Sequence, residues 1–119
     1  MDVREEKQSR KEKQKMTSAR HVIRLVIEDI DTEIRMVESS LRYAEAKKSI
    51  NSDSKKMAMA AGDDYLIASA RYDTSIGYHA GLADECEDRI SVLKRKREYY
   101  ESLDKLYAEE EKEEAEVNE

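Results

Sequence analysis

The sequence contains no proline, phenylalanine or tryptophan, one cysteine and three glycines among its 119 residues. Proline breaks a helix interior because it lacks a backbone donor and clashes with the preceding turn, so its absence is typical of long uninterrupted helices. Folds rich in tight turns use more glycine than this, which argues against a sheet. The single cysteine, Cys86, excludes an intramolecular disulfide, and we expect it to pack as a small apolar residue.

Long apolar runs are missing as well. Charged residues make up 42% of the chain and hydrophobic residues 39%, and no run approaches the ~20 apolar residues that a membrane-spanning helix needs. The first residues, 1–6, lack the apolar core of a signal peptide. With no such segments and one free thiol, we expect a cytoplasmic protein, located in the host cytoplasm if its origin is viral.

Charge is distributed unevenly along the chain. Residues 1–20 hold seven basic and four acidic groups, a net charge of +3, whereas residues 108–119 hold seven glutamates and one lysine, a net charge of −6. Blocks of like charge at chain ends tend to be solvated and poorly ordered. The sequence therefore predicts a basic flexible N-terminal tail over 1–16 and an acidic C-terminal tail over 111–119.

The apolar residues in the first half follow a regular spacing. The steps between them alternate between four and three residues, which gives a repeat of 3.5 residues. Such a repeat keeps an apolar seam facing a partner helix along its whole length, so it predicts a helix packed as in a coiled coil. This first seam consists of Ile23, Ile27, Ile30, Ile34, Val37, Leu41 and Ala44.

A second seam runs through the other half of the chain, where one residue in every seven falls on a single line. Two such seams in one chain predict that helix packs against helix. The seven-residue line consists of Tyr65, Tyr72, His79, Cys86, Leu93, Tyr100 and Tyr107, and its half-step partners are Ser69, Ile76, Ala83, Ile90, Arg97 and Asp104.

The strongest turn signal separates the two seams. The tetrapeptide Asn-Ser-Asp-Ser at 51–54 carries side chains that bond to the local backbone and compete with a helix. The predicted fold class is all-α, a long helical hairpin or a short helical bundle with coiled-coil packing. A short second helix and a long third one, forming a three-helix bundle, are the alternative. The predicted helical domain spans 17–110, with a helix at about 18–50, a turn at 51–54 and a long helix at about 55–110, strained or kinked near Gly62 or Gly77.

The predicted helix lengths leave an apolar overhang. In a hairpin, the first helix reaches only to about Cys86 or Ile90 of the second, so the apolar side chains beyond have no partner within the chain. An exposed apolar surface of this size usually marks an interaction, and a two-fold dimer is the commonest solution. We therefore expect a homo-oligomer whose seam consists of Ile76, Ile90, Leu93, Tyr100, Leu103 and Tyr107.

The sequence offers little for catalysis or metal binding. His79 and Cys86 lie seven residues apart, about 10 Å along one helix, which is too far for the hydrogen bond that activates a nucleophile. The acidic cluster at 84–88 lacks a convergent ligand pattern, because consecutive helical residues point in different directions. We expect no catalytic residue, no metal, no cofactor and no enzymatic activity.

Basic residues beside tyrosines form a candidate binding surface. Exposed tyrosine and arginine are enriched in binding hot spots, and Tyr99 lies off the seam, flanked by Arg95 and Lys96. We expect a partner protein to bind these three residues. The alternative is a small nucleic-acid-associated protein that uses the basic N-terminal tail and the cluster Arg89–Arg97 to neutralise phosphates. The net charge of −6 disfavours binding to a polyanion.

Taken together, these features favour a non-enzymatic protein-interaction module that acts as an adaptor, a scaffold or a small inhibitor of a partner protein. In composition, the chain resembles many phage or plasmid accessory proteins, which are small, helical and highly charged. That resemblance implies a viral or plasmid accessory role and rests on no motif.

Overall fold

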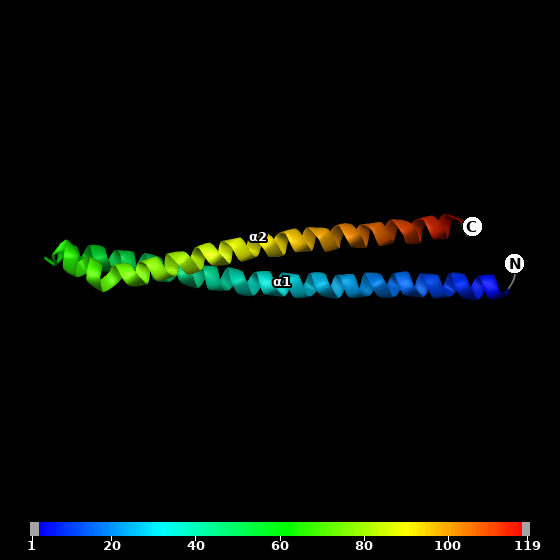
Figure 1. Ribbon diagram of the computed structural model, residues 1–119, viewed down its shortest axis with the longest axis horizontal. Coiled ribbons are helices and arrows are strands. Elements are labelled where there is room, and N and C mark those ends of the chain that lie inside the picture. The colour runs from blue at the N-terminus through cyan, green and yellow to red at the C-terminus, as the bar shows by residue number, and fades with distance from the viewer. Residues whose placement is uncertain (1–2, 118–119) are drawn as a thin grey trace. The chain divides into compact units, whose positions relative to one another are not determined.

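The computed structural model describes the backbone of residues 3–117 and the side chains of Arg10 and residues 18–117. Within these residues the chain forms two helices and no strand: α1 spans Val3–Ala60 and α2 spans Tyr65–Val117 (Figure 1). The predicted all-α hairpin is confirmed. The three-helix alternative is wrong, because α2 continues without a break through Gly77.

Both helices extend further toward the chain ends than the sequence analysis predicts. α1 begins at Val3 rather than near residue 18, and α2 ends at Val117 rather than near residue 110. Lysine, glutamate, glutamine and arginine dominate these ends and are good helix formers, and a helix that is already nucleated is easily extended. The described parts of the two predicted tails are therefore helical. Residues 1–2 and 118–119 lie outside the described residues.

Gly62 ends α1, because its backbone adopts a conformation that other residues rarely take. Its φ angle is 107°, and it is the one residue with a positive φ within residues 3–117. The N–H of Asp63 donates to the carbonyl of Ala58 at 3.0 Å, and the N–H of Gly62 donates to the carbonyl of Met59 at 3.1 Å. This pair of bonds is the Schellman motif, which satisfies the last carbonyl groups of a helix.

Asp64 begins α2 directly after this motif. Its carboxylate accepts the N–H of Leu66 at 2.9 Å, which is the geometry of a helix N-cap. The turn therefore occupies residues 61–64, and the predicted turn at 51–54 is wrong, since those four residues lie inside α1.

The polar residues of α1 near 51–54 remain helical because they find partners on α2. The side chain of Asn51 donates to the hydroxyl of Ser75 at 2.8 Å, and the Lys55 ammonium donates to the Asp73 carboxylate at 2.7 Å. Asn51 and Lys55 continue the spacing of the first seam beyond Ala44. Polar side chains thus occupy seam positions here, and cross-helix bonds replace the local backbone bonds of a turn.

The chain divides into two compact units. Unit 1 comprises Met1–Thr32 and Lys94–Glu119, and unit 2 comprises Glu33–Leu93. Unit 2 contains the turn and the two antiparallel helical segments on either side of it, drawn from cyan through green to yellow in Figure 1.

The core of unit 2 is a single seam in which small and large side chains are combined. Ala68 is fully buried opposite α1, so the two helices approach closely next to the turn. The buried residues of unit 2 are Ile34, Val37 and Ala44 on α1 and Ala68, Ala83, Ile90 and Leu93 on α2.

The core of unit 1 is thinner. Ile23 and Ile30 of α1 are buried, whereas the apolar seam residues of α2 in unit 1, Tyr100, Leu103 and Tyr107, are half-buried. Every residue of the first predicted seam is buried or half-buried, and so is every residue of the second apart from Tyr65. The assignment of both seams from their spacing is confirmed.

The premise of an apolar overhang is wrong. Because α1 begins at Val3, its first part pairs with the last part of α2 inside unit 1, and Leu93 and Ile90 are already buried within one chain in unit 2. The six residues predicted as an oligomer seam therefore line intrachain packing. Self-association stays a prediction, and its surface has to be sought elsewhere.

Candidate interaction surfaces

Many large apolar side chains remain exposed outside the seams of residues 18–117. Three groups of them stand out, two in unit 2 and one in unit 1. The tip patch consists of Met59, Tyr65, Leu66 and Ile67, the α1 stripe of Met36, Tyr43, Ile50 and Met57, and the Tyr99 face of Arg95, Lys96, Tyr99 and Leu106.

The tip patch surrounds the turn of unit 2. Met59 lies in the last turn of α1, and Tyr65, Leu66 and Ile67 form the first turn of α2. Leu66 is 73% exposed and Ile67 is 55% exposed, because the next residue, Ala68, takes the buried position of this turn. The patch thus presents several large side chains from a turn whose backbone is fixed at both helix ends.

Lys55 contacts the tip patch through the ring of Tyr65. Its ammonium pairs with Asp73 at 2.7 Å and lies 4.7 Å from the centre of the Tyr65 ring, a cation–π distance. The hydrogen bond with Asp73 raises the pKa of Lys55 and lowers the pKa of Asp73. Tyr65 is therefore anchored on one side while its other side faces solvent.

A polar cluster lies in the seam of unit 2, next to the α1 stripe. The Ser75 hydroxyl accepts from Asn51 and lies 3.3 Å from Nδ1 of His79. That same nitrogen lies 2.7 Å from the carbonyl oxygen of Ser75, which can only accept, so Nδ1 carries a proton. A protonated Nδ1 cannot remove the proton of the Ser75 hydroxyl, so Ser75 and His79 do not form a nucleophile with its base. The cluster instead joins α1 to α2 through the bond between Asn51 and Ser75.

The α1 stripe meets α2 around the ring of His79. The rings of Tyr43 and Tyr78 both pack edge-on against His79, with centroid distances of 6.3 and 5.2 Å. Tyr43 and Tyr78 themselves stay largely exposed. The aromatic surface of unit 2 therefore includes side chains from both helices.

Ion pairs take the place of apolar contacts in the seam of unit 1. Arg20 donates to Asp104 at 3.2 Å and to Glu111 at 2.8 Å, and these bonds raise the pKa of Arg20. Arg97 lies 3.1 Å from the carboxylate of Asp31. Arg97 and Asp104 are both seam residues of α2, which explains why the core of unit 1 is thin.

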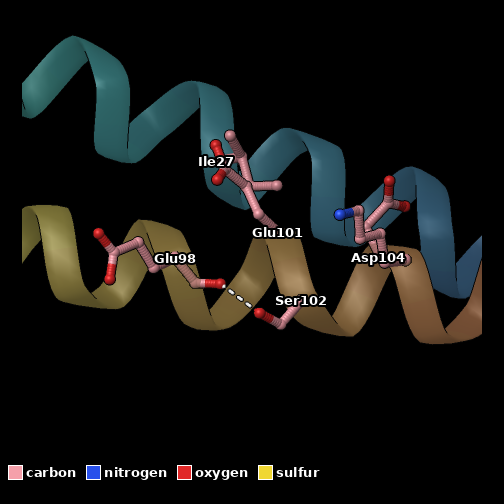
Figure 2. A pocket seen from close by; sticks show the side chains of 6 residues that line it. Ile27, Glu98, Glu101, Ser102 and Asp104 are labelled. Carbon is pink, nitrogen blue, oxygen red and sulfur yellow. Dashed lines mark hydrogen bonds between the residues drawn. The ribbon is translucent and has the colours of Figure 1, made fainter.

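An open groove of about 570 Å³ lies in unit 1 beside these ion pairs. Figure 2 shows Ile27 on α1 and Glu98, Glu101, Ser102 and Asp104 on α2 around it. Two of its carboxylates already have cationic partners, since Arg97 pairs with Glu101 and Arg20 with Asp104. The groove exists because polar side chains face Ile27, which is left half-buried.

The residues predicted to bind a partner lie on one face of α2 in unit 1. Arg95, Lys96 and Tyr99 are all exposed, and the Tyr99 ring, 63% exposed, packs edge-on against Tyr100 at 5.3 Å. Leu106 lies one heptad beyond Tyr99 and is also exposed, although the predicted partner-binding residues do not include it. Its spacing of seven residues from Tyr99 is the signal that would have found it.

The basic cluster from Arg89 to Arg97 is partly neutralised by acidic residues. Arg89 pairs with Glu33 in unit 2, and Arg97 pairs with Asp31 and Glu101 in unit 1. Phosphate binding by these two arginines would have to compete with those carboxylates.

Cys86 lies half-buried on the seam of unit 2, as predicted for a packed thiol. It borders a space of about 170 Å³ together with Val37, Ser40 and Arg89. Among the described residues, no three histidine, cysteine, aspartate or glutamate side chains gather where they could hold a metal ion. Neither helix, over residues 3–117, carries an apolar stretch suited to crossing a membrane.

The chain matches no family model, and no curated protein or solved structure shows significant similarity to it.

Proposed function

We propose that this chain is a non-enzymatic protein-interaction module, an adaptor, scaffold or small inhibitor, which binds its partner protein through the tip patch. The observation that carries this proposal is the exposure of four large apolar side chains around one turn, Met59, Tyr65, Leu66 and Ile67. Large exposed apolar side chains gathered around one turn, on a protein with this much charge, are typical of an interaction site.

The backbone of the turn supports this role. The Schellman motif at Gly62 ends α1 and the Asp64 carboxylate caps α2, so the backbone beneath the patch is fixed by hydrogen bonds before a partner arrives. A preformed surface loses little conformational entropy on binding, which leaves more of the apolar contact energy for affinity. The tip patch also holds more apolar side chains than the Tyr99 face, where only Tyr99 and Leu106 are large and exposed.

The matching partner surface is an apolar pocket on another protein. Leu66 is the most exposed member of the patch and Tyr65 is anchored by Lys55, so Leu66 is the side chain best placed to enter such a pocket. Residues at the centre of an interface supply most of the binding energy. We therefore expect Leu66→Ser to weaken partner binding about tenfold or more.

The test compares two serine substitutions on the same helix. Leu66→Ser alters the patch, whereas Ala70→Ser changes an exposed residue one turn further along α2. A partner captured from source lysate with nuclease present is purified, and its affinity for wild type, both serine variants and Tyr99→Ala is measured. Weaker binding by Leu66→Ser alone supports the proposal.

Three other results would argue against it. Equal affinity of wild type and Leu66→Ser removes the tip patch from consideration. Loss of binding in Tyr99→Ala alone moves the site to the Tyr99 face. Loss of the partner when nuclease is added, together with binding that weakens steeply with salt, favours the nucleic-acid alternative. The ion pairs of Arg89 and Arg97 with carboxylates disfavour that alternative.

A further inference from the structure

The α1 stripe of unit 2 repeats every seven residues on the exposed side of the helix. Met36, Tyr43, Ile50 and Met57 are 66%, 59%, 57% and 72% exposed. Four large apolar side chains in consecutive heptads form a continuous line along one helix face. The buried seam of α1 contacts α2, so this line is a second apolar face of the same helix.

The positions between the stripe residues complete a second 3.5-residue repeat. Ser39, Ala46 and Asp53 fall three residues after Met36, Tyr43 and Ile50 and four before the next member, and all three are exposed. Ser39 and Ala46 are small, so the backbone of another helix can approach between the large side chains. A 3.5-residue repeat of this kind fits a helical partner with the same repeat.

The stripe and Tyr78 together provide most of the surface that a stable interface needs on each partner. With aromatic side chains covering about 150–250 Å² each and the other members somewhat less, the exposed parts of the four stripe residues and Tyr78 amount to roughly 600–700 Å². A standard interface buries about 800 Å² on each partner, rim included.

We propose that a second copy of this chain covers the stripe, and that the two α1 helices pack antiparallel about a two-fold axis between Tyr43 and Ile50. Met36 of each copy then meets Met57 of the other, and Tyr43 meets Ile50. A two-fold arrangement uses the same patch on both copies and closes on itself, so no further copies are recruited.

The charges along the stripe favour this antiparallel register. In it, Lys47 lies opposite Ala46 of the second copy, and Asp53 lies opposite Ser40. A parallel register would instead place Lys47 against Lys47 and Asp53 against Asp53, and like charges in contact are unfavourable. The antiparallel pair avoids the contact between the two copies of Asp53, whereas the two copies of Lys47 lie near each other beside the axis in either register.

The first test is the mass in solution. Light scattering at tens of micromolar protein should give twice the chain mass of 13.8 kDa for wild type. Ile50→Lys should shift this to the chain mass, while Ser49→Lys, which places the same charge on the neighbouring exposed position off the stripe, should remain dimeric. Circular dichroism should show equal helicity in all three. A monomeric wild type, or a dimer that survives Ile50→Lys, overturns the proposal.

Disulfide crosslinking tests the register with the fold intact. In a Cys86→Ser background, Ala46→Cys lies beside its own copy next to the axis and should crosslink on oxidation. Met57→Cys alone should not, because the two copies of residue 57 lie about 30 Å apart along the helices. The double variant Met36→Cys with Met57→Cys should crosslink again. Crosslinking by Met57→Cys alone, or failure of Ala46→Cys, overturns the antiparallel stripe.

Discussion

Replacing glycine by alanine should have opposite effects at the turn and inside α2. At Gly62, Gly77 and Gly81 an added Cβ would have no atom within 4 Å apart from the adjacent residues and the nearby backbone of its own helix, so crowding by more distant groups does not distinguish the three sites. Only the backbone differs, because Gly62 has a φ of 107° while Gly77 and Gly81 lie within α2. The sign of each effect therefore reports the local backbone conformation alone.

The magnitudes follow from backbone preferences. A non-glycine residue in a left-handed conformation costs about 1–2 kcal/mol, so Gly62→Ala should lower the free energy of unfolding by that amount. Alanine in a helix interior is favoured over glycine by about 0.5–1 kcal/mol, so Gly77→Ala and Gly81→Ala should each raise it. The gap between the two kinds of variant is about 2 kcal/mol, or roughly 8 °C in melting temperature.

Thermal unfolding followed by circular dichroism measures this gap. All variants are compared at one protein concentration, because self-association would make the melting temperature depend on concentration. If Gly62→Ala stabilised the chain as much as Gly77→Ala does, Gly62 would be helical and the turn would not lie at 61–64. If Gly77→Ala destabilised it, α2 would be interrupted at Gly77.

Two further predictions concern the seam and the ion pair of unit 2. Ile34→Ala should destabilise the chain by about 2–5 kcal/mol because it removes a buried side chain, whereas Val92→Ala, at an exposed position of unit 2 outside the seam and the stripe, should cost well under half of that; similar losses of melting temperature would show that the seam is misassigned. Asp73→Asn should matter most at neutral pH. The hydrogen bond between the two side chains lowers the pKa of Asp73 and raises the pKa of Lys55. The stabilisation is therefore lost as pH falls through the lowered Asp73 pKa, below its ordinary 3.8. It is also lost as pH rises through the raised Lys55 pKa, above its ordinary 10.5. A difference in melting temperature from wild type that stays constant from acid to alkaline pH would contradict this.

The two seams could be predicted because they depend on spacing within each helix. Ile30, Ile34 and Val37 are buried in their units because a 3.5-residue repeat keeps them on the helix face that packs against another helix. Predicting their burial requires no knowledge of the partner helix. Fold class and antiparallel pairing followed from the same repeat. The exposed α1 stripe also had a sequence signal, the seven-residue steps from Met36 to Met57, but its exposure required the structure.

The turn could not be located from local composition, because two candidate sites carried turn-forming residues. Asn51 favours a turn by itself, yet it stays helical through a bond to Ser75, which lies 24 residues away in sequence. Gly62 and Asp64 carried the correct signal, a glycine that ends one helix and an aspartate that begins the next. The seven-residue line of the second half begins only at Tyr65, after Gly62 and Asp64. The line is therefore compatible with a turn at these residues.

The position of the turn also determines the order in which the chain can fold. The bond between Lys55 and Asp73 spans 18 residues, whereas the bond between Arg20 and Glu111 spans 91. Closing the longer loop first costs on the order of 1 kcal/mol more in chain entropy, so we expect pairing to start beside the turn and proceed outward. During synthesis, the α1 part of unit 1 therefore waits for its partner until the α2 segment from Lys94 onward has been added. Throughout that interval Ile23 and Ile30 lack the α2 contacts that bury them in unit 1, so both isoleucines stay available for binding by a chaperone.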